Sequence, residues 1–404
     1  MDIEATKSSV RDKVEEILPQ LIEISDWLAD NPELGSEEYK SSKLLAEELE
    51  DNGFRVEMGV EGMETAFKAV YTSGVDGPKI AFLSEYDALP GVGHGCGHNI
   101  IGTASVGAGI ALSKIIHEIG GEVWVVGTPA EEGHGSSAGA KRRMAEAGFF
   151  EPVDVALMIH PCSGSSNVAA EFLAVTGVFV EFTGRSAHAA ADPHEGVNAL
   201  NAAVLTYMAI QANRQQLRRD ADPVIHGIIT EGGLASNVIP DRATLRFGVR
   251  SSDDSYVPEL VDVVVNSAKG AAIQTGCGVD TSVSTGLKSS ITNKPLQDLF
   301  YDLFRELGVE VEEPEITAAK PPKGSSDFAD VTHVVPGIHP MISIADASVP
   351  MHSGDFAEAT LTDRGHRGLE IGAVIFAMAA VELIERSDLL EEVKTAFKKG
   401  VKGN

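Results

Sequence analysis

Cysteine is scarce in this chain. Three occur among 404 residues, at Cys96, Cys162 and Cys277, too few for a disulfide framework, so we expect a reducing, cytoplasmic environment. The chain opens with the charged stretch MDIE, which is unlike a secretory signal peptide. No uncharged apolar run reaches about 18 residues, and no transmembrane helix is therefore expected.

Basic side chains are also few. The 32 Lys and Arg residues stand against 60 Asp and Glu residues, which gives a formal net charge of −28 at pH 7. A surface of that sign repels phosphates and anionic lipids, so neither nucleic acid nor membrane is an expected partner. Hydrophobic residues make up 43% of the chain and charged residues 23%, the composition of a soluble globular protein with a large core. The length allows two domains, or one domain interrupted by another.

Helical and strand patterns alternate in the first part of the chain. We predict helices at 10–28, 37–49 and 100–119, and strands at 79–84, 121–128 and 155–159. The strands are almost continuously apolar, which is typical of a mainly parallel sheet with helices on both faces.

The pattern changes near residue 175. Alternating strands and two helices follow, over 176–183, 196–212, 224–230, 243–249 and 257–272. This alternation indicates an antiparallel sheet with one solvated face. Helical patterns return at 296–307 and 368–384, and the Pro- and charge-rich stretch 310–324 is predicted to be an exposed loop. The chain therefore predicts an α/β domain in two segments, 1–174 and 289–404, interrupted by a smaller α+β domain, 175–288.

Polar side chains gather where the predicted strands end, which is where ligands bind in open α/β sheets. Glu85, Asp87, Cys96 and His98 follow strand 79–84, Glu131 and Glu132 follow 121–128, His160 follows 155–159, and His352 follows a further predicted strand at 341–344. Thiol, imidazole and carboxylate groups together suit Zn²⁺, and all but the thiol suit Mn²⁺ equally well. In an adjacent carboxylate pair, one member can bind the metal while the other acts as a general base.

Each of these residues also has a structural interpretation. Cys96 alone could be a small buried apolar residue, and His98 could cap the helix that follows it. The adjacent glutamates could form a solvated turn. His160 and His352, taken singly, are more often structural than ligating, and only their joint placement at strand ends favours a common site.

Seven motifs are spread in order along nearly the whole chain. They are NPELG (31–35), EYDALP with GCGHN (85–99), PAEEG (129–133), GRSAHAA (184–190), GG with NVIPD (232–241), GSSD (324–327) and MHS (351–353). In this order they resemble the M20 family of metallopeptidases. The resemblance is to its amidohydrolase branch of aminoacylase-like proteins, indole-acetyl-amino-acid hydrolases, aminobenzoyl-glutamate hydrolases and β-alanyl-lysine-type dipeptidases.

The resemblance implies a role for each matching position. The implied metal ligands are Cys96, His98, Glu132, His160 and His352. Glu131 matches the general base, and Asp87 matches a carboxylate that supports a ligating imidazole. His188 matches a histidine that reaches the active site of the partner subunit and polarises the scissile carbonyl, and Asn237 matches a residue near the substrate.

The same resemblance implies the wider organisation. The two-segment α/β domain is then the catalytic domain, and 175–288 is a lid through which two chains form a homodimer. One or two divalent ions, Zn²⁺ or Mn²⁺, are expected in each subunit.

One position departs from the wider family. Two-zinc members carry His-x-Asp where this chain has Glu85-Tyr86-Asp87, so a histidine ligand is missing there. In the amidohydrolase branch, the residues at the positions of Cys96 and His98 supply replacement ligands. Glu85 is then predicted to line the pocket or to read a substrate amine rather than to bind metal.

The predicted function is that of a metal-dependent amidohydrolase which cleaves small N-acyl or N-aroyl amino acids or dipeptides with metal-activated water. Arg250 could bind a substrate carboxylate or form a salt bridge within the lid, and Ser326 belongs to a turn whose family counterpart borders the substrate pocket. The alternatives are hydrolytic deamination of an aromatic amine and a non-catalytic binding or regulatory descendant. Glu131 favours an enzyme, because a binding protein needs no base.

Overall fold

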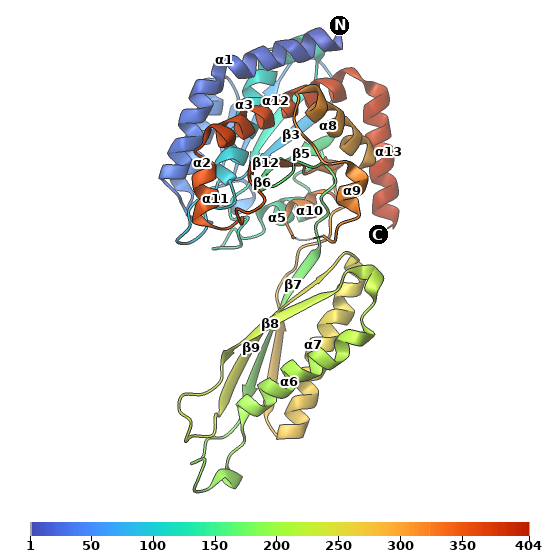
Figure 1. The fold of residues 1–404 in the computed structure, drawn as a ribbon. Coiled ribbons are helices and arrows are strands. Elements are labelled where there is room, and N and C mark those ends of the chain that lie inside the picture. Colours follow the sequence, from blue (N-terminus) through green and yellow to red (C-terminus); the bar gives the residue numbers. More distant parts are fainter. Residues whose placement is uncertain (1, 323, 404) are drawn as a thin grey trace. The chain divides into compact units, whose positions relative to one another are not determined.

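The computed structural model describes residues 2–322 and 324–403. The chain divides into two compact units. Unit 1 contains residues 2–171, 290–320 and 326–403, and unit 2 contains 172–289 with 321, 322, 324 and 325. The α/β fold with a separate antiparallel-sheet insert confirms the predicted fold class (Figure 1).

Unit 1 is built on a six-stranded sheet. Its strands, in spatial order, are β1 (Arg55–Met58), β2 (Phe67–Thr72), β4 (Glu122–Gly127), β3 (Lys79–Ser84), β5 (Val155–Leu157) and β11 (Gly337–Ile338). β4, β3, β5 and β11 are parallel, whereas β1 and β2 add an antiparallel edge. A separate parallel pair is formed by β6 (His160–Ser163) and β12 (Met341–Ala345). The carboxyl ends of the parallel strands therefore share one edge of the sheet.

Two hydrophobic cores cover the two faces of this sheet. The larger core joins the strands to α1 (Ile3–Asp30), α3 (His98–Ser113) and α12 (Asp363–Glu385). The smaller core joins them to α5 (Ala140–Glu146) and α10 (Phe328–Val331). Every residue of α3 is buried, and a Cβ at Gly102 would lie 2.6 Å from the carbonyl oxygen of Glu85. Glycine at this position lets α3 pack directly beneath the end of β3.

The remaining helices of unit 1 lie around these cores. They are α2 (Tyr39–Asp51), α4 (Ile116–Ile119), α8 (Lys294–Glu306), α9 (Pro314–Ala318), α11 (Gly354–Ala359) and α13 (Ser387–Gly403). No helix within residues 2–322 and 324–403 has both the length and the apolar character needed to cross a bilayer.

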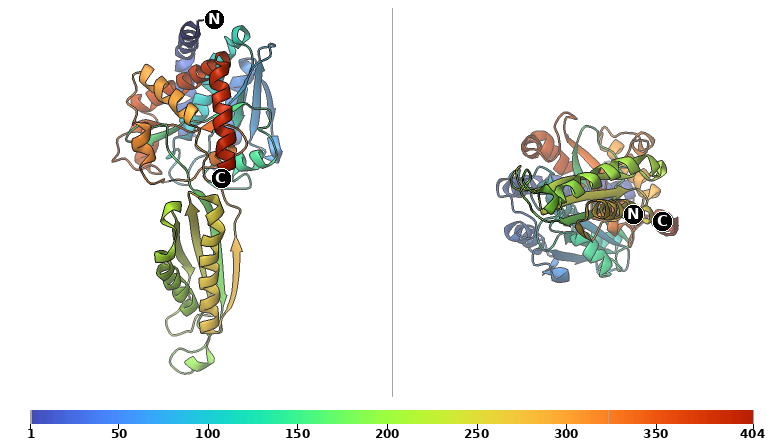
Figure 2. Two further views of the ribbon diagram at one scale, coloured as in Figure 1. Left: turned by 90° about the vertical axis from the view of Figure 1, so that its right-hand side faces the viewer. Right: turned by 90° about the horizontal axis from the view of Figure 1, so that it is seen from below.

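Unit 2 is a four-stranded antiparallel sheet with two helices on one face (Figure 2). Its strands, in spatial order, are β10 (Gly278–Val283), β7 (Ala174–Thr183), β9 (Arg242–Ser251) and β8 (Val224–Glu231). The helices are α6 (Ala199–Asn213) and α7 (Val257–Thr275). Burial alternates along β7 because every second side chain packs into the core beneath these helices.

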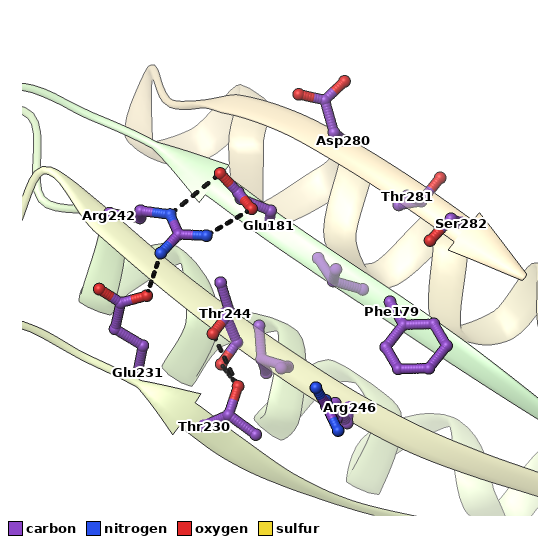
Figure 3. Close-up of a pocket in the computed structure, with 12 residues that line it drawn as sticks. Phe179, Glu181, Thr230, Glu231, Arg242, Thr244, Arg246, Asp280, Thr281 and Ser282 are labelled. Atoms are coloured by element: carbon purple, nitrogen blue, oxygen red, sulfur yellow. Dashed lines mark hydrogen bonds and ion pairs between the residues drawn. The ribbon is translucent and has the colours of Figure 1, made fainter. Parts of the chain in front are cut away.

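The other face of the unit 2 sheet carries charged and polar side chains together with the exposed ring of Phe179 (Figure 3). Arg242 pairs with Glu181 on the neighbouring strand, Nη2 to Oε2 at 2.9 Å, and also with Glu231. The hydroxyl groups of Thr230 and Thr244 lie 2.6 Å apart. These cross-strand pairs border a shallow hollow of about 610 Å³, and none of the described residues that line it belongs to the predicted site. The hollow is best explained as the solvated face of the sheet.

Several elements escaped the sequence patterns. β1, β2, β10 and α13 were not predicted, and the 100–119 helix is divided into α3 and α4. The predicted loop 310–324 is wrong in part, because it contains α9, where Pro314 and Thr317 are buried. Proline fits the first turn of a helix, where its missing N–H costs nothing, so its presence does not argue for a loop.

Candidate metal centre

The five predicted ligands converge around the Cys96 thiol. Its Sγ lies 3.3 Å from His160 Nε2 and 3.4 Å from His352 Nε2. Glu132 Oε1 lies 3.8 Å from His352 Nε2 and 4.0 Å from His98 Nε2. Zn–ligand bonds of about 2.0–2.3 Å place donor atoms about 3.3–3.8 Å apart around a tetrahedral ion. The observed spacings therefore suit one divalent ion, or two ions that share Cys96.

Hydrogen bonds at Nδ1 orient two of the three imidazoles, those of His98 and His160, and leave Nε2 as the atom available to a metal. His98 Nδ1 lies 2.9 Å from both Asp87 Oδ1 and the Asp87 carbonyl oxygen, and His160 Nδ1 lies 2.7 Å from the Pro161 carbonyl oxygen. Asp87 Oδ2 also accepts a hydrogen bond from the backbone N–H of Glu132, at 2.9 Å. Asp87 thus orients two of the predicted ligands at once, as carboxylates behind metal-bound histidines generally do.

Two ligand atoms are buried without a hydrogen-bond partner in the part of the chain that the structure describes. They are His98 Nε2 and Glu132 Oε1. A buried polar atom without a partner costs free energy, which coordination of a cation would recover. The donor set and these two atoms together fit a divalent metal ion.

The electrostatics of the ligands also favour a cation. Burial raises the pKa of the Cys96 thiol, so a thiolate at this position requires a positive charge beside it. Burial lowers the pKa of His160 to about 4, which keeps this ligand neutral at ordinary pH. Burial opposes the charged form of His98 as well, but the carboxylates of Asp87 and Glu85 raise the pKa of His98 well above its usual value. A bound ion would replace the proton that these carboxylates attract.

Two of the five described non-glycine residues with positive φ lie at the candidate site. Ala130 and His352 have φ values of 58° and 62°, a region that is unfavourable for residues other than glycine. Each such residue costs on the order of 1–3 kcal/mol and persists only where its surroundings hold it. The N–H of His352 donates to the Gly95 carbonyl at 2.8 Å, and the N–H of Ala130 donates to Glu38 Oε1 at 2.9 Å. These contacts hold the His352 turn and the turn that carries both glutamates.

Glu131 lies next to the ligands and remains partly exposed. Its Oε2 is 3.9 Å from His98 Nε2, and 14% of its side chain is accessible to solvent. Burial and the nearby Glu85 carboxylate raise the pKa of Glu131 well above its ordinary value. A carboxylate in these surroundings binds a proton readily, which is the property that a general base requires.

Glu85 differs in its surroundings from Glu131. Its side chain is completely buried, with Oε1 2.8 Å from Lys141 Nζ and Oε2 3.4 Å from His98 Nε2. Glu85, which was predicted to line the pocket or to bind a substrate amine, is therefore paired with the amine of Lys141 in the same chain.

The predicted site residues of unit 2 lie on two adjoining loops and one strand. His188 is exposed, and its Nδ1 accepts hydrogen bonds from Ala190 N at 3.2 Å and Ala191 N at 3.1 Å. In the neutral ring the proton is therefore on Nε2, which can donate. The Asn237 carbonyl accepts a hydrogen bond from Ala189 N at 2.9 Å, which joins the loops of His188 and Asn237.

Two other predicted substrate residues have partners within their own units. Arg250, on β9, donates from Nη1 to the hydroxyl of Ser325 at 2.9 Å, a neutral partner rather than a carboxylate. Ser326 is buried in unit 1, and its hydroxyl accepts a hydrogen bond from Phe328 N at 3.2 Å.

Sequence reasoning missed Lys141 and His339, and it placed Asp327 only in a turn whose family counterpart borders the substrate pocket. The ring of His339 lies 5.5 Å from that of His160, centroid to centroid. His339 directly follows β11, and the strand-end argument applied to His160 could have found it. Lys141 lies in the run AKRRM, which reads as a solvated helix surface, yet its side chain is fully buried.

Replacing Cys96 with serine should weaken metal binding. A serine hydroxyl stays protonated where a thiolate would bind, so we expect the affinity for Zn²⁺ to fall by at least about tenfold. Competition with a chromogenic chelator measures the change. Cys162→Ser is the matched control, since Cys162 is also buried and its Sγ lies 3.6 Å from the Ser165 carbonyl oxygen. Full metal binding and activity in Cys96→Ser would remove the thiol from the site.

Glu38 should make the stability of the metal-free protein depend on pH. Burial and the neighbouring Asp87 raise the pKa of Glu38 from 4.5 to about 7. The folded state then binds a proton more tightly than the unfolded state, so stability falls as pH rises between these two values. The loss from this group reaches roughly 3 kcal/mol.

Urea unfolding at about pH 5 and about pH 8 measures this slope. Glu38→Gln should flatten it, whereas Glu37→Gln, at an exposed neighbouring position, should leave it unchanged. An identical slope in Glu38→Gln and the original chain would contradict the assignment.

Comparison with known proteins finds relatives that match residues of both units. The family model described as "Peptidase dimerisation domain" matches residues 174–275. The chain is 34% identical to Xaa-Arg dipeptidase of Mus musculus, and the match covers 98% of this chain and 93% of that protein. It is also 32% identical to one of the chains of p-aminobenzoyl-glutamate hydrolase from Escherichia coli, over 74% of this chain and 65% of that one.

Solved structures show the same fold. A putative aminohydrolase from methicillin-resistant Staphylococcus aureus matches with a TM-score of 0.77 at 20% identity, over 94% of this chain and all of that one. A dinuclear metal-binding peptidase of the M20 family from Bacillus subtilis matches with a TM-score of 0.68 at 21% identity, over 91% of this chain and 99% of that one.

Proposed function

This chain belongs to the M20 peptidase family and is a hydrolase of amide bonds, and on that basis we propose that it cleaves dipeptides and small N-acyl or N-aroyl amino acids. The observation that carries the proposal is the gathering of four proposed ligand side chains around the fifth, Cys96, beside the partly exposed carboxyl group of Glu131. A binding protein would gain nothing from that carboxyl group, whereas hydrolysis requires a base.

The proposed ligands are Cys96, His98, Glu132, His160 and His352. A bound divalent ion would activate the attacking water and polarise the amide carbonyl. Two groups of donor atoms, Cys96 with His98 and His160, and Cys96 with Glu132 and His352, have the thiol in common. Two ions joined by Cys96 would use both groups, and the soft thiolate and imidazoles favour Zn²⁺ over Mn²⁺.

The protein's own groups would carry the proton and hold the substrate. Glu131 takes the proton from the attacking water and delivers it to the leaving amine. His188 donates a hydrogen bond from Nε2 to the oxygen on which negative charge develops, in the active site of the partner subunit. Asn237, on the loop beside His188, contacts the substrate, and Arg250 binds its carboxylate.

A homodimer through unit 2 is part of this proposal. Large apolar side chains are exposed there, among them Met208 at 60% and Ile273 at 85%, on α6 and α7. Leu234, on the loop after β8, is fully exposed. Exposed apolar surface of this kind is typical of a protein interface, and the dimerisation-domain match covers the same residues.

The net charge of the chain favours a dipeptide with a cationic side chain as the substrate. A net charge of −28 attracts cations and repels anions. The mouse relative is named for dipeptides that end in arginine, and the bacterial relative for an anionic aroyl amino acid. We therefore propose Xaa-Arg dipeptides as the preferred substrates, with the aroyl and acyl amino acids cleaved more slowly.

A substrate panel tests the proposed function. Dipeptides ending in arginine, N-acyl amino acids and p-aminobenzoyl-glutamate are incubated with metal-stripped protein and with protein reloaded with Zn²⁺ or Mn²⁺. We expect cleavage of the Xaa-Arg dipeptides by the reloaded protein and none by the stripped protein. Release of ammonia without amide cleavage would indicate a deaminase, and no reaction at full metal loading would indicate a non-catalytic descendant.

A further inference from the structure

A lysine is buried beside the candidate metal centre. Lys141 is the second residue of α5, and its Nζ lies 2.8 Å from Glu85 Oε1 and donates a hydrogen bond to Asp327 Oδ1. The backbone N–H of Lys141 donates to the other oxygen of Asp327 at 3.1 Å. The side chains of all three residues are at most 2% exposed. Lysine is almost never buried to this extent unless it is paired, so the ammonium group and the two carboxylates depend on one another.

The carboxylates around Lys141 form a group that would otherwise suit a metal ion. Glu85, Glu131 and Asp327 each offer one oxygen, and these oxygens lie within 4.8 Å of one another. Three carboxylates at this spacing are ligands for hard cations such as Mn²⁺ and Mg²⁺. The Lys141 ammonium contacts two of the three, so a cation belonging to the chain already occupies this group.

The buried ammonium also fixes the direction of Glu85. One oxygen of Glu85 is held by Lys141, and the other lies 3.4 Å from His98 Nε2. His98 Nδ1 is hydrogen-bonded to Asp87, so the two carboxylates lie on opposite sides of this imidazole, and the Glu85 oxygen faces Nε2 without a hydrogen bond. Lys141 therefore acts on a proposed metal ligand through Glu85 and does not touch it directly.

We propose that the Lys141 ammonium group occupies the Glu85–Glu131–Asp327 group in place of a divalent ion. Metal then binds only to the Cys96 ligand set. Lys141 is then a positioning residue: it balances the charge next to the base Glu131 and aligns Glu85 with His98. The inference rests on the proposed metal centre and is independent of which amide is the substrate.

The test is the metal content of Lys141→Met, in which a side chain of similar length lacks the charge. Without the ammonium, the three carboxylates are left unbalanced and able to bind a hard cation. We expect Lys141→Met to bind one further Mn²⁺ per chain, measured by elemental analysis and by the Mn²⁺ EPR spectrum after gel filtration. Its melting temperature should also rise more steeply with added Mn²⁺ than that of the original protein.

Lys7→Met is the matched control. Lys7 is a second buried lysine of unit 1, paired with Glu382 and with the exposed carboxylates of Glu4 and Glu306. Its removal should lower stability without adding a tightly bound Mn²⁺. Lys141→Arg keeps the charge and should retain the original metal count.

The outcomes separate the inference from the proposed function. An unchanged Mn²⁺ count in Lys141→Met, with no additional stabilisation by Mn²⁺, would overturn the role of Lys141. If Lys141→Met is insoluble, recovery of folded protein on refolding with Mn²⁺ supports the inference, and equal loss with and without Mn²⁺ overturns it. The proposed function fails instead if the unmodified protein binds no metal or cleaves no amide.

Discussion

Replacing Glu131 with glutamine should reduce kcat by about 10²–10⁴-fold while the divalent metal remains bound. The amide keeps the size of the carboxyl group but cannot take a proton from water or return one to the leaving amine. The carboxyl group is partly exposed and lies 3.9 Å from His98 Nε2, so the change removes the proposed proton acceptor and leaves the five proposed ligand side chains in place. The kcat for the best substrate of the panel and the metal content of the same sample measure the two effects.

Glu132→Gln is the control for this experiment. Glu132 precedes Gly133 on the same turn, and its Oε1 lies 3.8 Å from His352 Nε2, so its loss should lower metal affinity as well as rate. The two neighbouring glutamates are thereby distinguished by metal content. A near-normal kcat in Glu131→Gln at full metal loading would contradict the assignment of the base.

His188→Ala should lower kcat by about 10²–10³-fold, the effect of removing one hydrogen-bond donor to the developing oxyanion. The metal content should stay unchanged, because His188 is proposed as a donor and not as a ligand. His194→Ala is the matched control, since His194 is exposed in the same unit and pairs with its neighbour Glu195. Metal loss in His188→Ala would instead indicate direct ligation.

Mixing two inactive variants tests whether His188 acts in the partner's active site. In a dimer of one His188→Ala chain and one Glu131→Gln chain, one active site keeps both its own Glu131 and an intact His188 from the partner. Random exchange of subunits in an equal mixture should restore about a quarter of the original rate per site. No recovery, with heterodimers shown by mass spectrometry, would mean that His188 acts within its own chain.

The parts of the fold that the sequence predicted are those with strong apolar patterns. The predicted strand 79–84 coincides with β3, because its four consecutive apolar residues, 80–83, are all buried. β10 was missed because its side chains are almost all exposed and show no such pattern. The helix α9 was missed because proline and charge were interpreted as loop signals, whereas Pro314 occupies the first turn of that helix.

The residues of the candidate site also divide into those that the sequence could place and those that it could not. Side chains that follow strands, such as Glu85 and His160, could be placed near one another from the topology of a parallel sheet alone. The burial of Lys141 could not, because three basic residues in succession usually indicate a solvated surface. The strain at Ala130 and His352 also leaves no sequence signal, since neither residue type indicates a positive φ.

The position of the bound metal tests the central claim most directly. An anomalous difference map, from crystals of the Zn²⁺-loaded protein measured at the zinc edge, locates the ion without reference to activity. The account predicts a peak within about 2.0–2.3 Å of Cys96 Sγ and the Nε2 atoms of His160 or His352. The account would be contradicted by a fully loaded crystal with no peak beside Cys96, or with its only peak among the carboxylates around Lys141.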